Sequence, residues 1–110
     1  MKVHIIKLAT IKNYVEANND CHSAFFNWVN FIKSADWKKP SDILSTFRNA
    51  DILGKGTNRV IFNIGGNNYR MICSYYFGTK TVHLYINWIG THSEYDKLCK
   101  QNLQYTIDNY

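Results

Sequence analysis

Residues 59–70 read RVIFNIGGNNYR, and this stretch decides the fold that the sequence predicts. Val60, Phe62 and Ile64 alternate with other residues before the turn, and such alternation indicates a strand with one buried face. The GGNN segment supplies the residue types that tight hairpin turns prefer. A second alternating run begins at Tyr69. The stretch therefore predicts a β-hairpin.

Two alternating runs, residues 69–76 and 81–88, continue the pattern and are separated by a Gly-Thr-Lys turn. Strands joined by short turns pair antiparallel, and such a sheet can bury one face against helices while the other stays open. On this pattern Trp88 belongs to the helix-covered face. The open face is expected to be polar, partly basic and rich in tyrosine. It would hold Arg59, Asn63, Arg70, Ser74, Tyr76, His83, Tyr85 and Asn87.

The residues before these strands include apolar residues at the spacing typical of helices. The clearest helix covers residues 21–35, where apolar residues fall at i, i+3, i+4 and i+7. The residues of this stripe are Phe25, Trp28, Val29 and Ile32. Residues 8–15 carry a shorter stripe, and residues 3–6 are expected to form a first strand. The Asn-Asn-Asp segment before residue 21 is placed to cap the longer helix.

The remaining segments are assigned from turn and capping residues. Residues 41–47 are expected to form a short helical turn, and residues 51–58, with two glycines, are predicted to be a loop. Thr91 is placed to cap a last helix that reaches Cys99. No structure is assigned to residues 100–110, which are mostly polar.

These elements are expected in a single α+β domain over residues 1–110, because a chain of 110 residues is long enough for one core. The hydrophobic content of 45% excludes wholesale disorder. The net charge of +5 favours a polyanionic or acidic partner, because lysine and arginine neutralise phosphates and release counterions. The alternative is that the charge serves solubility alone.

The cysteines and the N-terminal residues bear on cofactors and location. Cys21, Cys73 and Cys99 form no CxxC or Cys/His ligand spacing, so neither a metal nor another cofactor is expected. The first residues, MKVHII, are too short and polar for a signal peptide, and no apolar run approaches a membrane span. Reduced thiols without an export signal predict the cytoplasm and no membrane partner.

Residues 90–97 read GTHSEYDK and place His92, Tyr95 and Lys97 just after the last strand. Metal-free RNA cleavage needs a base for the 2′-hydroxyl, cations for the phosphate and an acid for the leaving 5′-oxygen. Histidine can be base or acid, and arginine can hold a phosphate with two hydrogen bonds. In an antiparallel meander the start of one strand lies beside the end of the next, so Arg70 is expected to approach His92.

Each of these residues also has an ordinary structural interpretation. His92 can simply occupy the start of a helix, and Tyr95 can be a core residue, given its spacing from the apolar residues after it. Arg59 and Arg70 can be solvent-facing strand residues. Pattern alone leaves these alternatives open.

The same residues carry a family resemblance. The segments WKKP at 37–40, NRVIFNIGGNNYR at 58–70 and GTHSEYDK at 90–97 resemble the HigB-type toxins of type II toxin–antitoxin systems, within the RelE-like group. The resemblance implies a RelE- or microbial-RNase-like fold, with helices on one face of a small, twisted, mostly antiparallel sheet. It implies a metal-independent mRNA interferase, an endoribonuclease that typically cleaves messages in the ribosomal A site. It also implies a helix-turn-helix, HigA-like antitoxin.

The resemblance further implies roles for single residues. Arg70 matches the strand arginine that contacts the scissile phosphate. His92 matches the region where these toxins place a second arginine or a histidine, and Tyr95 matches the late tyrosine that stacks on the substrate or assists proton transfer. The implied catalytic residues therefore come from two segments, the second strand of the predicted hairpin and the residues that follow the last strand.

One part of the RelE pattern is missing. RelE carries two lysines on the strand before the hairpin, and the corresponding positions here are Ile61 and Asn63. The general base is therefore expected to be His92 or Lys97. Further RNA contacts on the open face are assigned to Arg59, Asn63 and Tyr85.

A second group of cations lies in the connection between helix and sheet, at Lys38, Lys39, Arg48 and Lys55. They are expected to hold ribosomal RNA through its backbone, a contact that weakens steeply with salt. The alternative is a solvated loop. Two other functions also stay open: a non-catalytic RNA-binding module, and a protein-interaction domain whose basic face docks an acidic partner.

Overall fold

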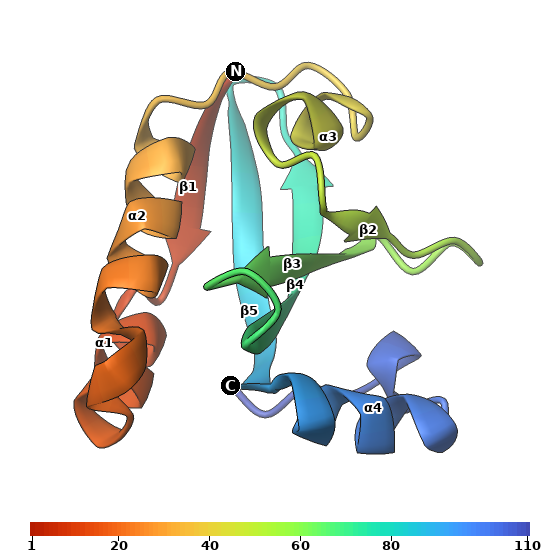
Figure 1. Cartoon of the computed structure of the whole chain (residues 1–110). Helices are drawn as coiled ribbons and strands as arrows, with labels where there is room; N and C mark the ends of the chain where they lie inside the picture. The colour runs from red at the N-terminus through yellow and green to blue at the C-terminus, as the bar shows by residue number, and fades with distance from the viewer.

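A five-stranded sheet organises the chain, in the strand order β1-β5-β4-β3-β2 (Figure 1). The computed structural model describes all of residues 1–110. The strands are β1 (Lys2–Ile6), β2 (Asp51–Ile52), β3 (Arg59–Ile64), β4 (Tyr69–Phe77) and β5 (Thr81–Thr91). β1 pairs with β5 in parallel, and the other neighbouring pairs are antiparallel. The prediction of an α+β fold with a mostly antiparallel sheet is confirmed.

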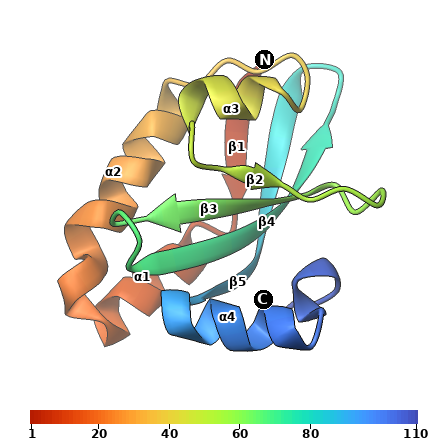
Figure 2. The ribbon, with the colours of Figure 1, turned by 45° about the vertical axis from the view of Figure 1, so that its right-hand side comes forward.

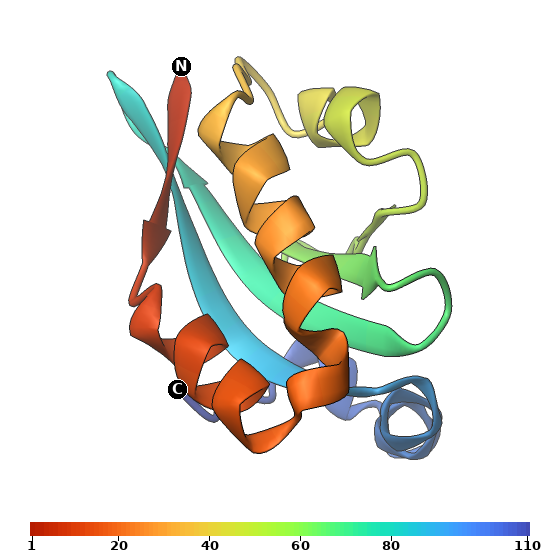
Figure 3. The same ribbon diagram turned by 60° about the vertical axis from the view of Figure 1, so that its left-hand side comes forward.

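Four α-helices and two short 3₁₀ turns complete the fold. They are α1 (Ala9–Ala17), η1 (Asn19–Cys21), α2 (His22–Lys33), α3 (Asp42–Thr46), α4 (His92–Lys100) and η2 (Leu103–Tyr105). Figure 3 shows α1 and α2 side by side along one face of the sheet. In Figure 2, α4 runs beneath β3 and β4, away from α2. None of the helices is long and apolar enough to span a bilayer.

The larger core lies between the sheet and the helices α1, α2 and α3. It contains 19 buried residues, among them the whole α2 stripe that helical spacing predicts. Phe25 and Phe62 are almost fully buried here, and the Trp37 indole donates a hydrogen bond to the Thr46 hydroxyl at 2.9 Å. Burying one large apolar side chain contributes about 1.5–3 kcal/mol, so this face supplies most of the driving force for folding. We call it the α2 face.

The pair of strands β4 and β5 contains a β-bulge that alternation does not reveal. The register shifts between Trp88 and Ile86, so Asn87 is the extra residue on β5. A bulge sets two successive side chains against one residue of the partner strand and shifts the alternation beyond it. The prediction that Trp88 shares the helix-covered face is therefore wrong. Its indole lies on the opposite side of the sheet, with Ile61 and Ile72.

The side of the sheet opposite α2 is not the open surface that the sequence predicts. Ile61, Ile72 and Trp88 form a second buried cluster there with Leu98 of α4. We call this side the α4 face. Three residues expected on an open face are instead buried, with exposed fractions of 8% for Arg59, 8% for Arg70 and 6% for Asn87. The reason is that α4 and the chain after it fold back over this face.

The C-terminal segment, residues 101–110, makes this cover. Arg59 Nη1 donates to the backbone oxygens of Gln104 and Ile107, at 3.2 and 2.7 Å. The backbone nitrogen of Asn109 donates to the Asn87 oxygen at 2.8 Å. These bonds fasten the segment to β3 and β5, although the sequence shows no pattern for it.

Two local predictions also need correction. Residues 51–58 are not all loop, because Asp51–Ile52 forms the short edge strand β2. The Asn-Asn-Asp segment does not cap α2, since neither η1 nor α2 has a side-chain cap. The predicted cap at Thr91 is confirmed: its hydroxyl accepts from the Glu94 backbone nitrogen at 3.2 Å.

Candidate active site

The hairpin turn and the start of α4 lie side by side at one end of the sheet. Gly65 and Gly66 both have positive φ, +67° and +68°, which a residue with a Cβ adopts only with strain. The turn that they permit brings the Asn68 carbonyl to the start of α4, where it accepts a hydrogen bond from the His92 backbone nitrogen at 3.0 Å. The two sequence segments that carry the family resemblance therefore meet.

A capping box sets the direction in which α4 leaves the sheet. The Thr91 hydroxyl accepts from the Glu94 nitrogen, and the Glu94 carboxylate accepts from the Thr91 nitrogen at 2.8 Å. These reciprocal bonds satisfy donors that the helix start leaves unpaired. His92 is consequently the first helical residue, immediately after the strand.

Gly90 makes room for an indole beneath this helix start. A Cβ built on Gly90 would lie 2.3 Å from the Trp88 ring, closer than any real contact. The indole therefore lies across the Gly90 backbone. Its ring centroid is 6.2 Å from that of Tyr95, so the two aromatic residues form the floor of the site.

Arg70 lies beside this floor, directly opposite Gly90 on β5 and Asn63 on β3. Its Nη1 donates to the Tyr69 oxygen at 3.1 Å, and its Nη2 approaches the Asn67 side-chain oxygen at 3.4 Å. A guanidinium carries five N–H donors, so these contacts orient it while leaving donors for a ligand. The arrangement suits one phosphate approaching from the turn.

Tyr95 is held in its neutral form. Burial raises the pKa of its hydroxyl, and the nearby Cys99 thiol and Asp51 carboxylate raise it further. The Arg70 charge acts in the opposite direction and lowers that pKa, which places the two side chains within electrostatic reach. A phenol in this state donates hydrogen bonds or offers its ring for stacking, but it is a poor proton acceptor near neutral pH.

His92 is the half-exposed member of the group. Its Nε2 is 3.7 Å from the Asp96 carboxylate one turn further along α4. Histidine changes charge near neutral pH and can take or give a proton in this range. Arg70, His92 and Tyr95 thus gather a cation, a titratable group and a hydroxyl around one end of the sheet.

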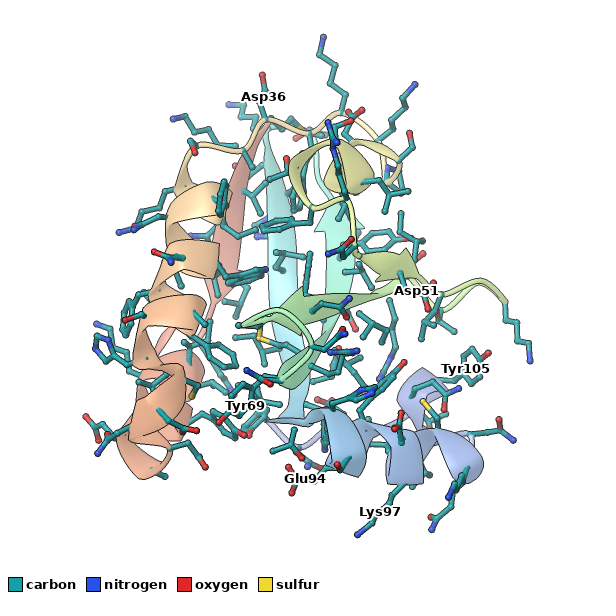
Figure 4. All side chains as sticks on the ribbon, in the orientation of Figure 1. Asp36, Asp51, Tyr69, Glu94, Lys97 and Tyr105 are labelled. Carbon is teal, nitrogen blue, oxygen red and sulfur yellow. The ribbon has the colours of Figure 1, made fainter.

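Lys97, the other candidate base, is not part of this group. In Figure 4 its side chain points away from the sheet, from the outer side of α4. The next residue, Leu98, is buried in the cluster beneath the helix. Because successive helical residues lie about 100° apart, Lys97 faces solvent when Leu98 faces the sheet.

The other residues assigned to RNA contact on the sheet are dispersed. Asn63 lies next to Arg70 and is partly exposed. Tyr85 is exposed on β5, beyond the bulge and away from α4. Burial lowers the pKa of the Arg59 guanidinium, with Asp108 opposing the shift, and its Nη1 bonds the C-terminal segment. Asn63 is thus the one of these three that adjoins the site.

The loop cations lie elsewhere. Lys38 and Lys39 are exposed beside Tyr76, at the far end of β4, roughly 20 Å from Arg70 for six residues of strand. Their backbone nitrogens donate to the Asp42 carboxylate, at 2.7 and 3.2 Å, which orders the loop. The Lys55 ammonium lies 4.7 Å from the centroid of the Tyr105 ring. Arg48, after α3, is exposed.

Sequence reasoning misses several residues that shape the site, namely Asp51, Asn67, Trp88, Gly90 and Cys99. The signal for Gly90 was available, since a glycine at the end of a strand suggests a close approach by another group. The others depend on register and on the path of α4. Alternation cannot provide either of these.

Comparison with known proteins places these features in a family. Residues 21–98 match the family of HigB toxins, described as the RelE-like toxic component of a toxin–antitoxin system. The matched region includes Arg70, His92 and Tyr95. It leaves out β1, α1, the last two residues of α4 and the whole C-terminal segment.

Three characterised proteins resemble the chain over most of its length. It is 28% identical over 98 residues to the mRNA interferase HigB of Escherichia coli O6:H1, covering 89% of this chain and 93% of that protein. It is 27% identical over 94 residues to the mRNA interferase toxin HigB of Escherichia coli K12, covering 86% and 88%. The mRNA interferase HigB of Shigella flexneri matches to the same extent, 27% over 94 residues.

Proposed function

Because the chain belongs to the HigB family of RelE-like toxins, we propose that it cleaves mRNA without a metal ion, at the site formed by Arg70, His92 and Tyr95. The observation that carries the proposal is the hydrogen bond from the His92 nitrogen to the Asn68 oxygen. It holds the start of α4, which carries the candidate base, against the hairpin turn that leads into Arg70 on β4. The relatives named as mRNA interferases support the choice of substrate.

The reaction begins at the 2′-hydroxyl of the nucleotide before the scissile bond. His92 takes its proton, and the 2′-oxygen attacks the neighbouring phosphorus. The bond from phosphorus to the 5′-oxygen breaks, which leaves a 2′,3′-cyclic phosphate and a 5′-hydroxyl. Arg70 stabilises the charge that grows on the phosphate oxygens, and it is oriented for this before the substrate arrives.

Tyr95 supplies the remaining proton in this scheme. Its raised pKa keeps the hydroxyl protonated, so it can protonate the leaving 5′-oxygen as that oxygen becomes basic. The ring, beside Trp88, is also placed to stack on a base of the substrate. Tyr95→Phe separates the two roles, because it removes the hydroxyl and keeps the ring.

Three further parts of the proposal concern the setting of the reaction. The partner is an antitoxin with a helix-turn-helix domain, which covers the site formed by Arg70, His92 and Tyr95. The message is cut on the ribosome, with Lys38 and Lys39 on ribosomal RNA, and the protein acts in the cytoplasm. The scheme requires no metal ion, because His92, Arg70 and Tyr95 supply its base, its cation and its acid.

Cleavage of a message on purified ribosomes tests the proposal. We expect Arg70→Ala to slow cleavage by roughly 100- to 1,000-fold, by analogy with removing one oxyanion donor. We expect a large loss for His92→Ala, and products that end in a cyclic phosphate and a 5′-hydroxyl. A chelator of divalent cations should leave cleavage of free RNA intact.

Matched variants separate the site from general effects. Lys12→Ala removes a cation, and His22→Ala removes a histidine, from exposed positions on other helices. Both should cleave like the original protein, and cleavage by all four variants is compared per folded molecule, because Arg70 is buried and its loss also lowers stability. Full activity in folded Arg70→Ala, or products with a 5′-phosphate, would overturn the proposal.

A further inference from the structure

A cavity of about 410 Å³ lies on the α4 face, on the far side of the C-terminal segment from the active site, and half of its eight lining residues are hydrophobic. Its wall includes Lys7, Ser74, Tyr85, Asn87, Asp108 and Tyr110. This volume falls within the roughly 300–1,000 Å³ of typical ligand pockets. The RNA-cleaving site described above does not use it.

A chain of hydrogen bonds fixes the polar groups of this wall. The Ser74 hydroxyl donates to the Asn87 side-chain oxygen at 2.7 Å, and the Asn87 amide donates to one Asp108 carboxylate oxygen at 3.3 Å. The bulge on β5 is what turns Asn87 into this position. Asp108 therefore keeps its second carboxylate oxygen as an acceptor, held by a buried amide.

Aromatic rings and a lysine complete the cavity. Tyr85 and Tyr110 line it and remain 46% and 45% exposed, so both have ring surface available for stacking. Lys7, between β1 and α1, has a positive φ of 59°, which is unfavourable for a lysine. Such strain in a residue lining a cavity is typical of a functional position.

We propose that this cavity binds a guanine base of the RNA, an inference that rests on the proposed function. A carboxylate only accepts hydrogen bonds, and guanine offers two adjacent donors, N1–H and the N2 amino group. Lysine is a good partner for the O6 and N7 acceptors of the same base. Single-stranded RNA is recognised in this way, with bases splayed out, stacked on aromatic rings and bonded along their edges.

The location of the cavity fits a site that selects a base of the RNA rather than one that cleaves the RNA. Ser74 and Arg70 lie on the same side of β4, four residues apart, which is roughly 13 Å along the strand. A few nucleotides of one RNA strand span that distance. Four of the eight residues that line the cavity, Ile6, Lys7, Asp108 and Tyr110, lie outside the matched region 21–98.

Binding of short oligonucleotides tests the inference without cleavage. The probes are fluorescent 2′-O-methyl hexamers, which lack the attacking hydroxyl, with one guanine, inosine or adenine among pyrimidines. We expect the guanine hexamer to bind about ten- to a hundredfold more tightly than the adenine hexamer, the range for one two-bond contact to a base. Inosine lacks the N2 amino group and should fall between them. Free GMP, added as competitor, shows whether the base alone suffices or the RNA chain is needed.

Asp108→Asn identifies the cavity as the source of the preference. This variant should bind guanine and adenine hexamers alike, whereas Glu16→Gln, the same charge change on the exposed side of α1, should keep the preference. Equal binding of the three hexamers by the original protein would overturn the inference, even if the variants failed to fold. If that protein still cleaved messages, the proposed function would remain. If it preferred guanine but did not cleave messages, the guanine site would remain and the proposed function would be overturned.

Discussion

The two faces of the sheet are built in different ways. The α2 face holds 19 buried apolar residues under α1, α2 and α3, and β3 and β4 contribute to it by regular alternation. The α4 face holds a cluster of four buried apolar residues, and beside them the buried polar side chains of Arg59, Arg70 and Asn87. The α2 face therefore supplies most of the stability, whereas part of the buried area on the α4 face consists of polar groups.

The difference follows from the rules for burying each kind of group. Apolar side chains need only exclusion from water, so many combinations of residues satisfy the α2 face. A buried polar group needs a partner, and the three named on the α4 face each have one: the Tyr69 backbone oxygen for Arg70, Ser74 for Asn87 and the C-terminal segment for Arg59. These bonds also fix the orientation of Arg70.

The largest expected effect comes from emptying the α2 face. Phe25→Ala should lower the free energy of unfolding by about 3–5 kcal/mol, since Phe25 is fully buried and its loss leaves a cavity. Cleavage per folded molecule should stay close to that of the original protein. Urea unfolding, with activity corrected for the folded fraction, measures both.

Leu98→Ala is the matched truncation on the α4 face. It should lower the unfolding free energy by about 2–3 kcal/mol, toward the small end of the range for leucine. It should also slow cleavage, because Leu98 anchors the helix that carries His92 and Tyr95. If both variants lost activity only in proportion to their unfolded fraction, the α4 face would be no more important for cleavage than the α2 face.

Adding a methyl group at Gly90 gives an intermediate effect. Gly90→Ala drives a Cβ into the Trp88 ring, and overpacking of this kind costs about 1–3 kcal/mol. Displacing the indole also moves the floor beneath Arg70 and Tyr95, so cleavage should fall. Gly54→Ala, where nothing lies within 4 Å of the added Cβ, is the control. Equal melting temperatures for the two variants would contradict the proposed role of Gly90.

Arg59→Ala tests whether that arginine holds the chain or the RNA. Losing its bonds to Gln104 and Ile107 should lower the unfolding free energy by about 1–2 kcal/mol. Amide exchange in residues 104–109 should become faster, as the segment comes loose. The salt dependence of RNA binding should not change. A shallower salt dependence would indicate that Arg59 contacts RNA, as the sequence predicted.

The smallest effect is expected at the loop lysines. Lys38→Ala combined with Lys39→Ala should weaken ribosome binding by less than tenfold at physiological salt and flatten its salt dependence. Affinity for a short free RNA should hardly change, since that RNA meets Arg70. Sedimentation with ribosomes at two salt concentrations measures this. The double variant Lys12→Ala with Lys33→Ala, on α1 and α2, is the control, and equal behaviour of the two double variants would leave the loop without a role.

Much of this architecture was predictable. The α2 stripe, the three long strands, the Gly65–Gly66 turn and the Thr91 cap depend on neighbours in sequence, and each is found where expected. The family prediction is confirmed by the match over residues 21–98. The roles of Arg70, His92 and Tyr95 stay predictions, although the structure gathers them at one end of the sheet.

The fold class could be predicted from periodicity and turn types, because these depend on neighbouring residues, and the family could be predicted from the resemblance of three segments. The nature of the second face depends on contacts that no local pattern contains. The bulge at Asn87, the path of α4 and the return of the C-terminal segment each depend on contacts between residues far apart in the chain. A one-residue shift in register exchanges the two faces of a strand. That is why Trp88, Arg59 and the cavity beside Asp108 were out of reach of the sequence alone.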